Sequence, residues 1–154
     1  MDLRKLGSNT LKDLEIVLVD DSEPIREVLY RILNKIEGLK VVAMAADGNE
    51  ALTVIRNLRP DVVILDISMP HKDGIAVLRE IRKEDSSMMI IMFTADPSFV
   101  LEEVCRQEGA NHYVCKTQLS ELIDICQGLL ETHTCRALLN KSISLDILST
   151  VSLA

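Results

Sequence analysis

The sequence is poor in aromatic residues and contains no long hydrophobic run. Aromatic side chains make up 3% of the 154 residues and there is no Trp, so aliphatic side chains must fill the core. No segment approaches the roughly 20 consecutive apolar residues of a transmembrane helix. Residues 1–14 also lack the apolar block of a secretory signal. These absences predict a cytoplasmic protein that makes no membrane contact.

Paired cysteines and an excess of positive charge are also missing. The four cysteines (Cys105, Cys115, Cys126 and Cys135) form no C-x-x-C pair and no zinc-binding spacing, so we expect reduced, buried thiols. The formal net charge is −7, whereas a nucleic-acid-binding protein usually carries a basic patch. The composition therefore argues against direct contact with nucleic acid and suits a protein that groups carboxylates around a metal.

The chain contains enough apolar residues, 47%, for one sizeable core, and its length suits a single domain. Five apolar runs alternate with segments of helical periodicity. The runs cover residues 16–19, 41–45, 62–65, 89–93 and 112–115, and the helical segments cover residues 25–36, 51–58, 75–81, 100–105 and 119–130. Because the runs are apolar throughout, they predict a parallel sheet covered on both faces. We therefore expect a doubly wound, flavodoxin-like (βα)5 α/β fold with strand order 2-1-3-4-5.

Polar residues follow four of the predicted strands at their carboxyl ends. They are Asp20, Asp21, Asp66, Thr94 and Lys116. In the expected strand order these four strands are neighbours, so the side chains should converge at one edge of the sheet. Two carboxylates about 5 Å apart repel by roughly 3 kcal/mol at an effective dielectric of about 20. Three carboxylates therefore need compensation from the lysine and from a divalent cation.

This combination of residues suits phosphoryl chemistry. Magnesium prefers oxygen ligands and is commonly held by one or two carboxylates, water and a phosphoryl oxygen. A carboxylate can act as the nucleophile and form an acyl phosphate, while a metal and an ammonium group neutralise the developing charge. The hydroxyl of Thr94 could donate a hydrogen bond to the phosphoryl oxygens. The cluster therefore predicts a Mg²⁺ site that accepts a phosphoryl group.

Further motifs accompany these five residues. They are Leu65-Asp66-Ile67-Ser68-Met69-Pro70, Asp73-Gly74, Phe93-Thr94-Ala95, and Gly109-Ala110 followed by Tyr113 and Lys116. Together with the acidic pair Asp20-Asp21, this set resembles the receiver domains of two-component response regulators. The resemblance is nearest to the receivers of NarL/FixJ-type regulators and runs from about residue 16 to residue 130.

The resemblance implies a specific role for each acidic residue. Asp66 would be the phosphorylation site, taking its phosphoryl group from a sensor histidine kinase or a histidine phosphotransfer protein. Asp20, Asp21, Asp66 and the backbone carbonyl of Ser68 would hold Mg²⁺. Such a domain catalyses only its own phosphotransfer and dephosphorylation, and is a signalling module rather than an enzyme.

The resemblance also assigns a switch. Lys116 would pair with a phosphoryl oxygen, Thr94 would move towards the phosphoryl group, and Tyr113 would rotate inward behind it. This motion would change protein–protein contacts and could promote a homodimer. Many family members have a cis proline after the lysine, where this sequence has Thr117. Because a cis bond before Thr costs about 3 kcal/mol, the sequence leaves the form of this peptide open.

The chain ends suggest a short extension on each side of the receiver. We expect an N-terminal extension over residues 1–14, a receiver over residues 15–131 and an apolar C-terminal tail over residues 132–154. The tail could be an extra helix, packed on the receiver or joining two copies, or the start of a linker.

Three alternative functions are open. The chain could be the receiver half of a DNA-binding transcriptional regulator. It could also be a phosphatase of the haloacid-dehalogenase type, but those enzymes need a second acid where this sequence has Ser68. A pseudo-receiver is the third alternative, and the presence of all five strand-end residues argues against it.

Overall fold

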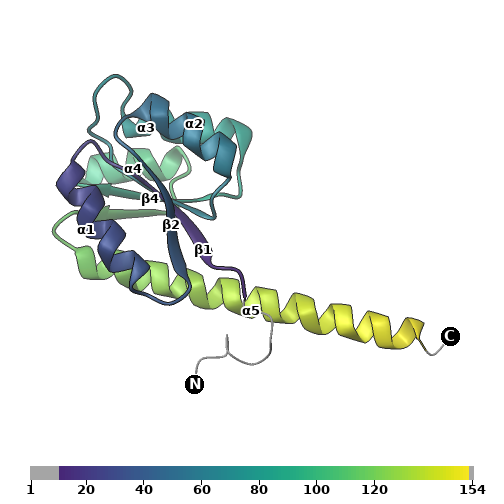
Figure 1. The fold of residues 1–154 in the computed structure, drawn as a ribbon. Helices are drawn as coiled ribbons and strands as arrows, with labels where there is room; N and C mark the ends of the chain where they lie inside the picture. Colours follow the sequence, from purple (N-terminus) through teal and green to yellow (C-terminus); the bar gives the residue numbers. More distant parts are fainter. Residues whose placement is uncertain (1–10, 153–154) are drawn as a thin grey trace.

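A computed structural model describes residues 11–152 as a central sheet surrounded by helices (Figure 1). The elements are β1 (Leu14–Val19), α1 (Glu23–Asn34), β2 (Leu39–Ala45), α2 (Gly48–Leu58), β3 (Val62–Leu65), α3 (Gly74–Glu84), β4 (Met89–Thr94), α4 (Phe99–Gln107), β5 (His112–Cys115) and α5 (Leu119–Val151). The strands pair in parallel in the order β2-β1-β3-β4-β5. The predicted doubly wound α/β fold and its strand order are therefore confirmed.

The sheet is buried on both faces, as its continuous apolar strands predict. Alternate residues of β1 point to opposite faces, as in any strand. Val17 and Val19 pack with α2, α3 and Cys105 of α4, whereas Ile16 and Leu18 pack with α1 and α5. The helices thus form two layers around the sheet, and only the ends of the strands are left to carry a polar site.

Aspartate side chains cap the starts of α2 and α3. Asp47 accepts hydrogen bonds from the backbone N–H groups of Asn49 and Glu50 at the start of α2. Asp73 accepts one from Ala76 at the start of α3. Caps of this kind satisfy N–H groups that have no partner inside the helix. Both helices start on the same side of the sheet as the carboxyl ends of the strands.

The last helix is longer than the sequence pattern suggested. The periodicity predicted a helix to about residue 130 followed by a separate tail, but α5 runs unbroken for 33 residues from Leu119 to Val151. His133 Nε2 lies 3.1 Å from the carbonyl oxygen of Lys12 and ties α5 to the segment before β1. Beyond this point the helix leaves the sheet and projects away from it (Figure 1). The boundaries expected at residues 14 and 131 stay predictions.

Several smaller expectations can be compared with the structure. All four cysteines are free, and Cys105 and Cys126 are buried as expected. Cys115 is only half-buried, and Cys135 is exposed because it lies where α5 leaves the sheet. Within residues 11–152 there is no cis peptide bond, so Lys116–Thr117 is trans.

No described helix is long and apolar enough to cross a membrane. Most of the expected N-terminal extension lies outside the described residues, and the cytoplasmic location stays a prediction.

Candidate functional site

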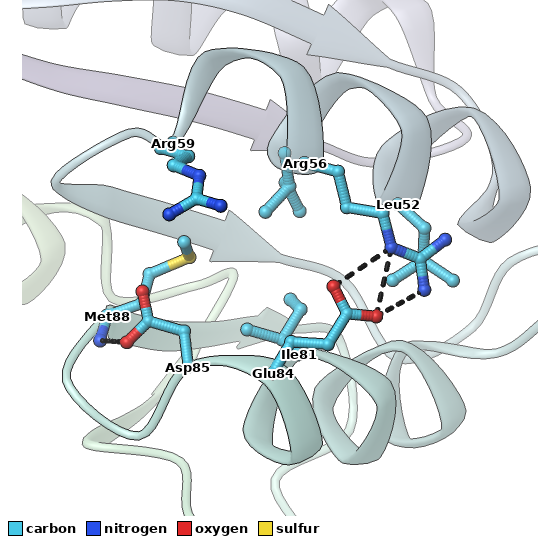
Figure 2. A pocket seen from close by; sticks show the side chains of 8 residues that line it. Leu52, Arg56, Arg59, Ile81, Glu84, Asp85 and Met88 are labelled. Carbon is cyan, nitrogen blue, oxygen red and sulfur yellow. Dashed lines mark hydrogen bonds and ion pairs between the residues drawn. The ribbon is translucent and has the colours of Figure 1, made fainter.

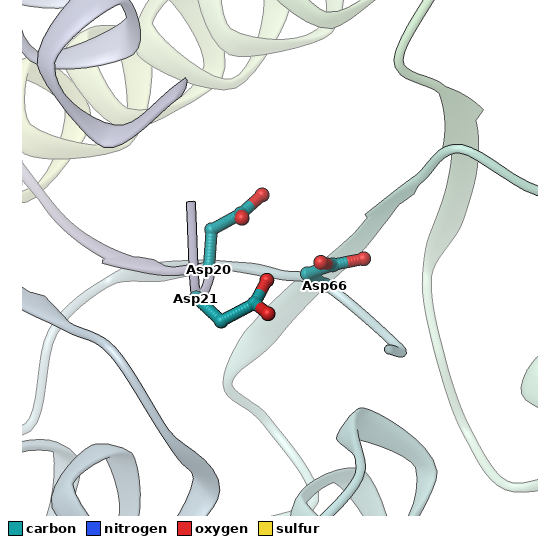
Figure 3. A group of neighbouring side chains, drawn as sticks. All are labelled: Asp20, Asp21 and Asp66. Atoms are coloured by element: carbon teal, nitrogen blue, oxygen red, sulfur yellow. The ribbon is translucent and has the colours of Figure 1, made fainter. Parts of the chain in front are cut away.

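The three predicted aspartates lie together at the carboxyl ends of β1 and β3 (Figure 3). One carboxylate oxygen from each of Asp20, Asp21 and Asp66 lies within 4.8 Å of the other two. The backbone N–H of Asp66 donates to the carbonyl of Val19 at 2.8 Å, and that of Asp20 donates to Ala45 at 3.1 Å. The sheet hydrogen bonding thus extends one residue past the strands and fixes both aspartates. Asp20 and Asp66 are buried, whereas Asp21 is exposed.

Lys116 brings a single ammonium group to two of these carboxylates. Its Nζ lies 2.6 Å from Asp20 Oδ2 and 3.0 Å from Asp66 Oδ2. Its backbone N–H donates to the carbonyl of Thr94 at 2.8 Å, which continues the pairing of β4 with β5. The trans peptide before Thr117 is therefore compatible with a lysine that reaches the acidic cluster.

The cluster is short of positive charge. Burial raises the pKa of Asp66, Lys116 acts to lower it, and the neighbouring Asp20 raises it again. Burial acts to lower the pKa of Lys116, but its contacts with Asp20 and Asp66 together raise that pKa above its ordinary value. Among the described residues, Asp66 Oδ1 is buried and has no hydrogen-bond partner. A buried carboxylate oxygen without a partner is costly, so this atom is suited to bind a cation or to attack an electrophile.

The loop after β3 packs tightly against the backbone of Asp66. Gly74 donates its N–H to the carbonyl of Ile67 at 2.8 Å. A Cβ at Gly74 would lie 2.0 Å from the backbone oxygen of Asp66, so only glycine allows α3 to start this close to the strand end. Ser68 lies in the same loop and is exposed, while His71 adopts a left-handed conformation with φ of 66°. The start of α3 thus helps to fix the position of Asp66.

The predicted switch residues Thr94 and Tyr113 lie on β4 and β5. Thr94 is buried at the end of β4. The hydroxyl of Tyr113 donates to the backbone carbonyl of Asp96 at 2.6 Å. Burial, with a smaller effect from Asp96, raises the pKa of Tyr113 to about 12. This hydrogen bond ties β5 to the loop that follows β4.

Replacing Tyr113 with Phe should remove this tie at a modest cost. We expect the free energy of unfolding to fall by about 1 kcal/mol, the usual net value of one hydrogen bond. Urea unfolding measures the change. Tyr30→Phe, at an exposed position of α1, is the matched control and should change stability by less than about 0.5 kcal/mol. Equal effects of the two substitutions would contradict the role of the Asp96 contact.

Sequence reasoning missed two residues that shape the site. Arg26 Nη1 donates to the backbone carbonyl of Asp20 at 2.6 Å and links α1 to the acidic cluster. Gly48 lets the start of α2 approach Lys72 in the loop before α3, because a Cβ there would lie 2.5 Å from its carbonyl oxygen. Neither contact has a signal in the sequence, since each joins segments that are distant along the chain.

Comparison with known proteins settles the family. The model described as "Response regulator receiver domain" matches residues 16–127. This chain belongs to the response regulator receiver family. Receiver domains are signalling domains, so the family assignment argues against the phosphatase alternative.

Several response regulators resemble this receiver. The probable C4-dicarboxylate response regulator DctR of Bacillus subtilis is 34% identical over 105 residues, which cover 68% of this chain and 46% of DctR. The chain therefore spans about half the length of that relative. A LuxR-family response regulator from Aurantimonas is 29% identical, with a TM-score of 0.73, over 86% of this chain and 99% of its own. The CheX–CheY–BeF3–Mg complex of Borrelia burgdorferi gives 30% identity and a TM-score of 0.68, over 74% and 90% of the two chains.

Proposed function

We propose that this receiver is activated by phosphorylation of Asp66 and then changes its protein–protein contacts. The phosphoryl group would come from a phosphohistidine on a sensor histidine kinase or a histidine phosphotransfer protein. The observation that carries the proposal is the buried, unpartnered Oδ1 of Asp66, which lies beside an ammonium group and within a cluster of three carboxylates.

The residues around Asp66 fit a magnesium ion. Asp20, Asp21 and Asp66 offer carboxylate oxygens, which are the ligands that Mg²⁺ prefers, and the backbone carbonyl of Ser68 would complete the protein ligands. When bound, the cation would neutralise negative charge on the phosphoryl oxygens. The similarity to a CheY whose complex contains beryllium fluoride and magnesium supports this choice of metal.

The residues of the chain have separate tasks in the transfer. A carboxylate oxygen of Asp66 attacks phosphorus, the P–N bond to the donor histidine breaks, and its electron pair returns to the imidazole ring. Lys116 is held 3.0 Å from Asp66 Oδ2, where its ammonium group can balance charge on the phosphoryl oxygens. The hydroxyl of Thr94 donates a hydrogen bond to one of them. Attack by water on the acyl phosphate later returns the free carboxylate, so the domain catalyses its own dephosphorylation.

Phosphorylation would then shift the balance between two packings of the domain. The new charge attracts Thr94, and Tyr113 with its hydrogen bond to Asp96 follows the movement of the loop after β4. A population shift of this kind needs a group that interacts differently with the two packings, and the phosphoryl group supplies it. The affected surface would bind downstream partners or form a phosphorylation-dependent homodimer.

A second candidate is the receiver half of a DNA-binding transcriptional regulator. It is favoured by the length of DctR, of which this chain covers 46%, and by the similarity to a LuxR-family regulator. In this case the same phosphorylation would act on an output domain instead of on a separate partner.

Thermal unfolding with magnesium and then beryllium fluoride tests the proposed function. Mg²⁺ at a hundred times its Kd should stabilise the receiver by about 2.7 kcal/mol, and beryllium fluoride should add to this because it mimics the phosphoryl group. Asp21→Asn should weaken the magnesium effect, and Asp66→Asn should abolish the further gain from beryllium fluoride. Asp146→Asn, at an exposed site on α5, is the matched control and should behave like the parent. A parent protein that responds to neither ligand would contradict the proposal.

A further inference from the structure

The exposed end of α5 carries a continuous row of large aliphatic side chains. The apolar row consists of Leu139, Ile143, Ile147 and Val151, which are 64%, 56%, 58% and 68% exposed. Residues four apart lie on the same face of a helix, so the four side chains form one ridge. The row starts beyond Thr134, the last buried residue of α5, and no residue that the structure describes covers it. It therefore lies outside the phosphorylation site and outside the surface around Tyr113.

This part of α5 is poorly suited to stand alone in water. Leu145 and Leu148 are also more than half exposed on other sides of the helix. The four side chains of the row alone present on the order of 400 Å² of apolar surface, which is within the range for the largest patch on a typical monomer. Ile, Val, Ser and Thr are frequent in this segment and favour helix less than Ala or Leu. A helix of this composition normally gains its stability from packing against a partner.

We propose that the apolar row is the interface with a second copy of this chain, formed without phosphorylation. Residues 138–151 contain two charged side chains, Lys141 and Asp146, whose charges cancel. A neutral, aliphatic helix face is complementary to an identical face and offers little to a nucleic acid or to charged lipid headgroups. The row offers on the order of 400 Å² in each copy, so two copies would together bury about 800 Å² of apolar surface, the size of a small and weak interface.

The arrangement of the row suits pairing about a two-fold axis. In a two-fold dimer the same patch of each copy contacts the other, so one self-complementary ridge is sufficient. Rows of residues four apart are also the ridges that interlock in the commonest class of helix packing. Pairing through α5 leaves Asp66 and Lys116 accessible in both copies, so each receiver could still exchange its phosphoryl group.

Sedimentation of the full chain without magnesium or a phosphoryl donor tests this inference. The parent should sediment at twice the 17.2 kDa mass of one chain. Ile143→Asp places a charge in the middle of the row and should give a monomer. Ser142→Asp is the matched control, because it adds the same charge at the neighbouring position about 100° around the helix, and should stay a dimer.

Circular dichroism gives a second readout that separates loss of pairing from failure to fold. Ile143→Asp should lose helical signal from the end of α5 while the receiver keeps its unfolding transition and its response to beryllium fluoride. A parent that remains a monomer at submillimolar concentration would overturn the inference. So would an Ile143→Asp variant that remains a dimer, and neither result would affect the proposed role of Asp66.

Discussion

Replacing Gly74 with Ala is expected to destabilise the receiver by about 3 kcal/mol or more, beyond the usual range for overpacking. The added Cβ would lie 2.0 Å from the backbone oxygen of Asp66, 2.8 Å from its carbonyl carbon and 2.9 Å from the Cα of Ile67. These are backbone atoms of the segment that carries the proposed phosphorylation site, so no side-chain rotation can relieve the overlap. Either α3 or Asp66 must move, and we expect phosphorylation to be slowed as well.

Gly128 in α5 provides the matched control for this substitution. A Cβ at Gly128 would meet nothing within 4 Å. Gly128→Ala should therefore stabilise the protein by about 0.5–1 kcal/mol, the gain expected for replacing glycine inside a helix. Urea unfolding of both variants gives the comparison. Similar stabilities for the two variants would show that α3 does not start as close to Asp66 as the structure indicates.

Replacing Lys116 with Met should cost about 3–5 kcal/mol at neutral pH, the cost of removing one partner from a buried ion pair. The ammonium group lies within 3.0 Å of both Asp20 Oδ2 and Asp66 Oδ2, and it is largely shielded from water. Without it, neither Asp20 nor Asp66 has an ion-pair partner among the described residues. Lys83→Met, at an exposed position of α3, is the control, and its effect should stay within about 0.5 kcal/mol.

The loss caused by Lys116→Met should depend on pH. Burial already raises the pKa of Asp66, and removal of Lys116 takes away the contact that acts to lower it. A carboxyl group whose pKa is higher in the folded state destabilises the fold when ionised, and this penalty is relieved as pH falls through the folded-state pKa. The difference in stability between variant and parent should therefore shrink in acid, and magnesium should reduce it at neutral pH. A difference that grows on acidification would contradict this account of the cluster.

The sequence predicts the fold and the cluster well because both depend on simple regularities. Runs such as Val62–Leu65 are apolar at every position, and this pattern indicates a parallel sheet buried on both faces. The carboxyl ends of neighbouring parallel strands meet at one edge, which is why Asp20, Asp66 and Lys116 could be expected together. Their contacts within 3.0 Å confirm that the residues converge, whereas their roles in phosphoryl transfer stay proposals.

Other features depend on contacts that no local pattern records. The close approach of Gly74 to Asp66 and the hydrogen bond from Arg26 to Asp20 join separate segments of the chain. The unbroken course of α5 was also missed, although the sequence after Glu131 has no proline or glycine to end the helix. Cys135 was expected to be buried because the cysteine spacing fits neither a disulfide nor a zinc site, and spacing does not record where α5 leaves the sheet.

The most direct test of the central claim is the intact mass of the protein after incubation with acetyl phosphate and Mg²⁺. The proposed role of Asp66 predicts an increase by the mass of one phosphoryl group. This increase should be absent when magnesium is removed and absent in Asp66→Asn, while Asp146→Asn should react like the parent. An unmodified parent, or an Asp66→Asn variant that gains the same mass, would contradict the assignment of Asp66 as the phosphoryl acceptor.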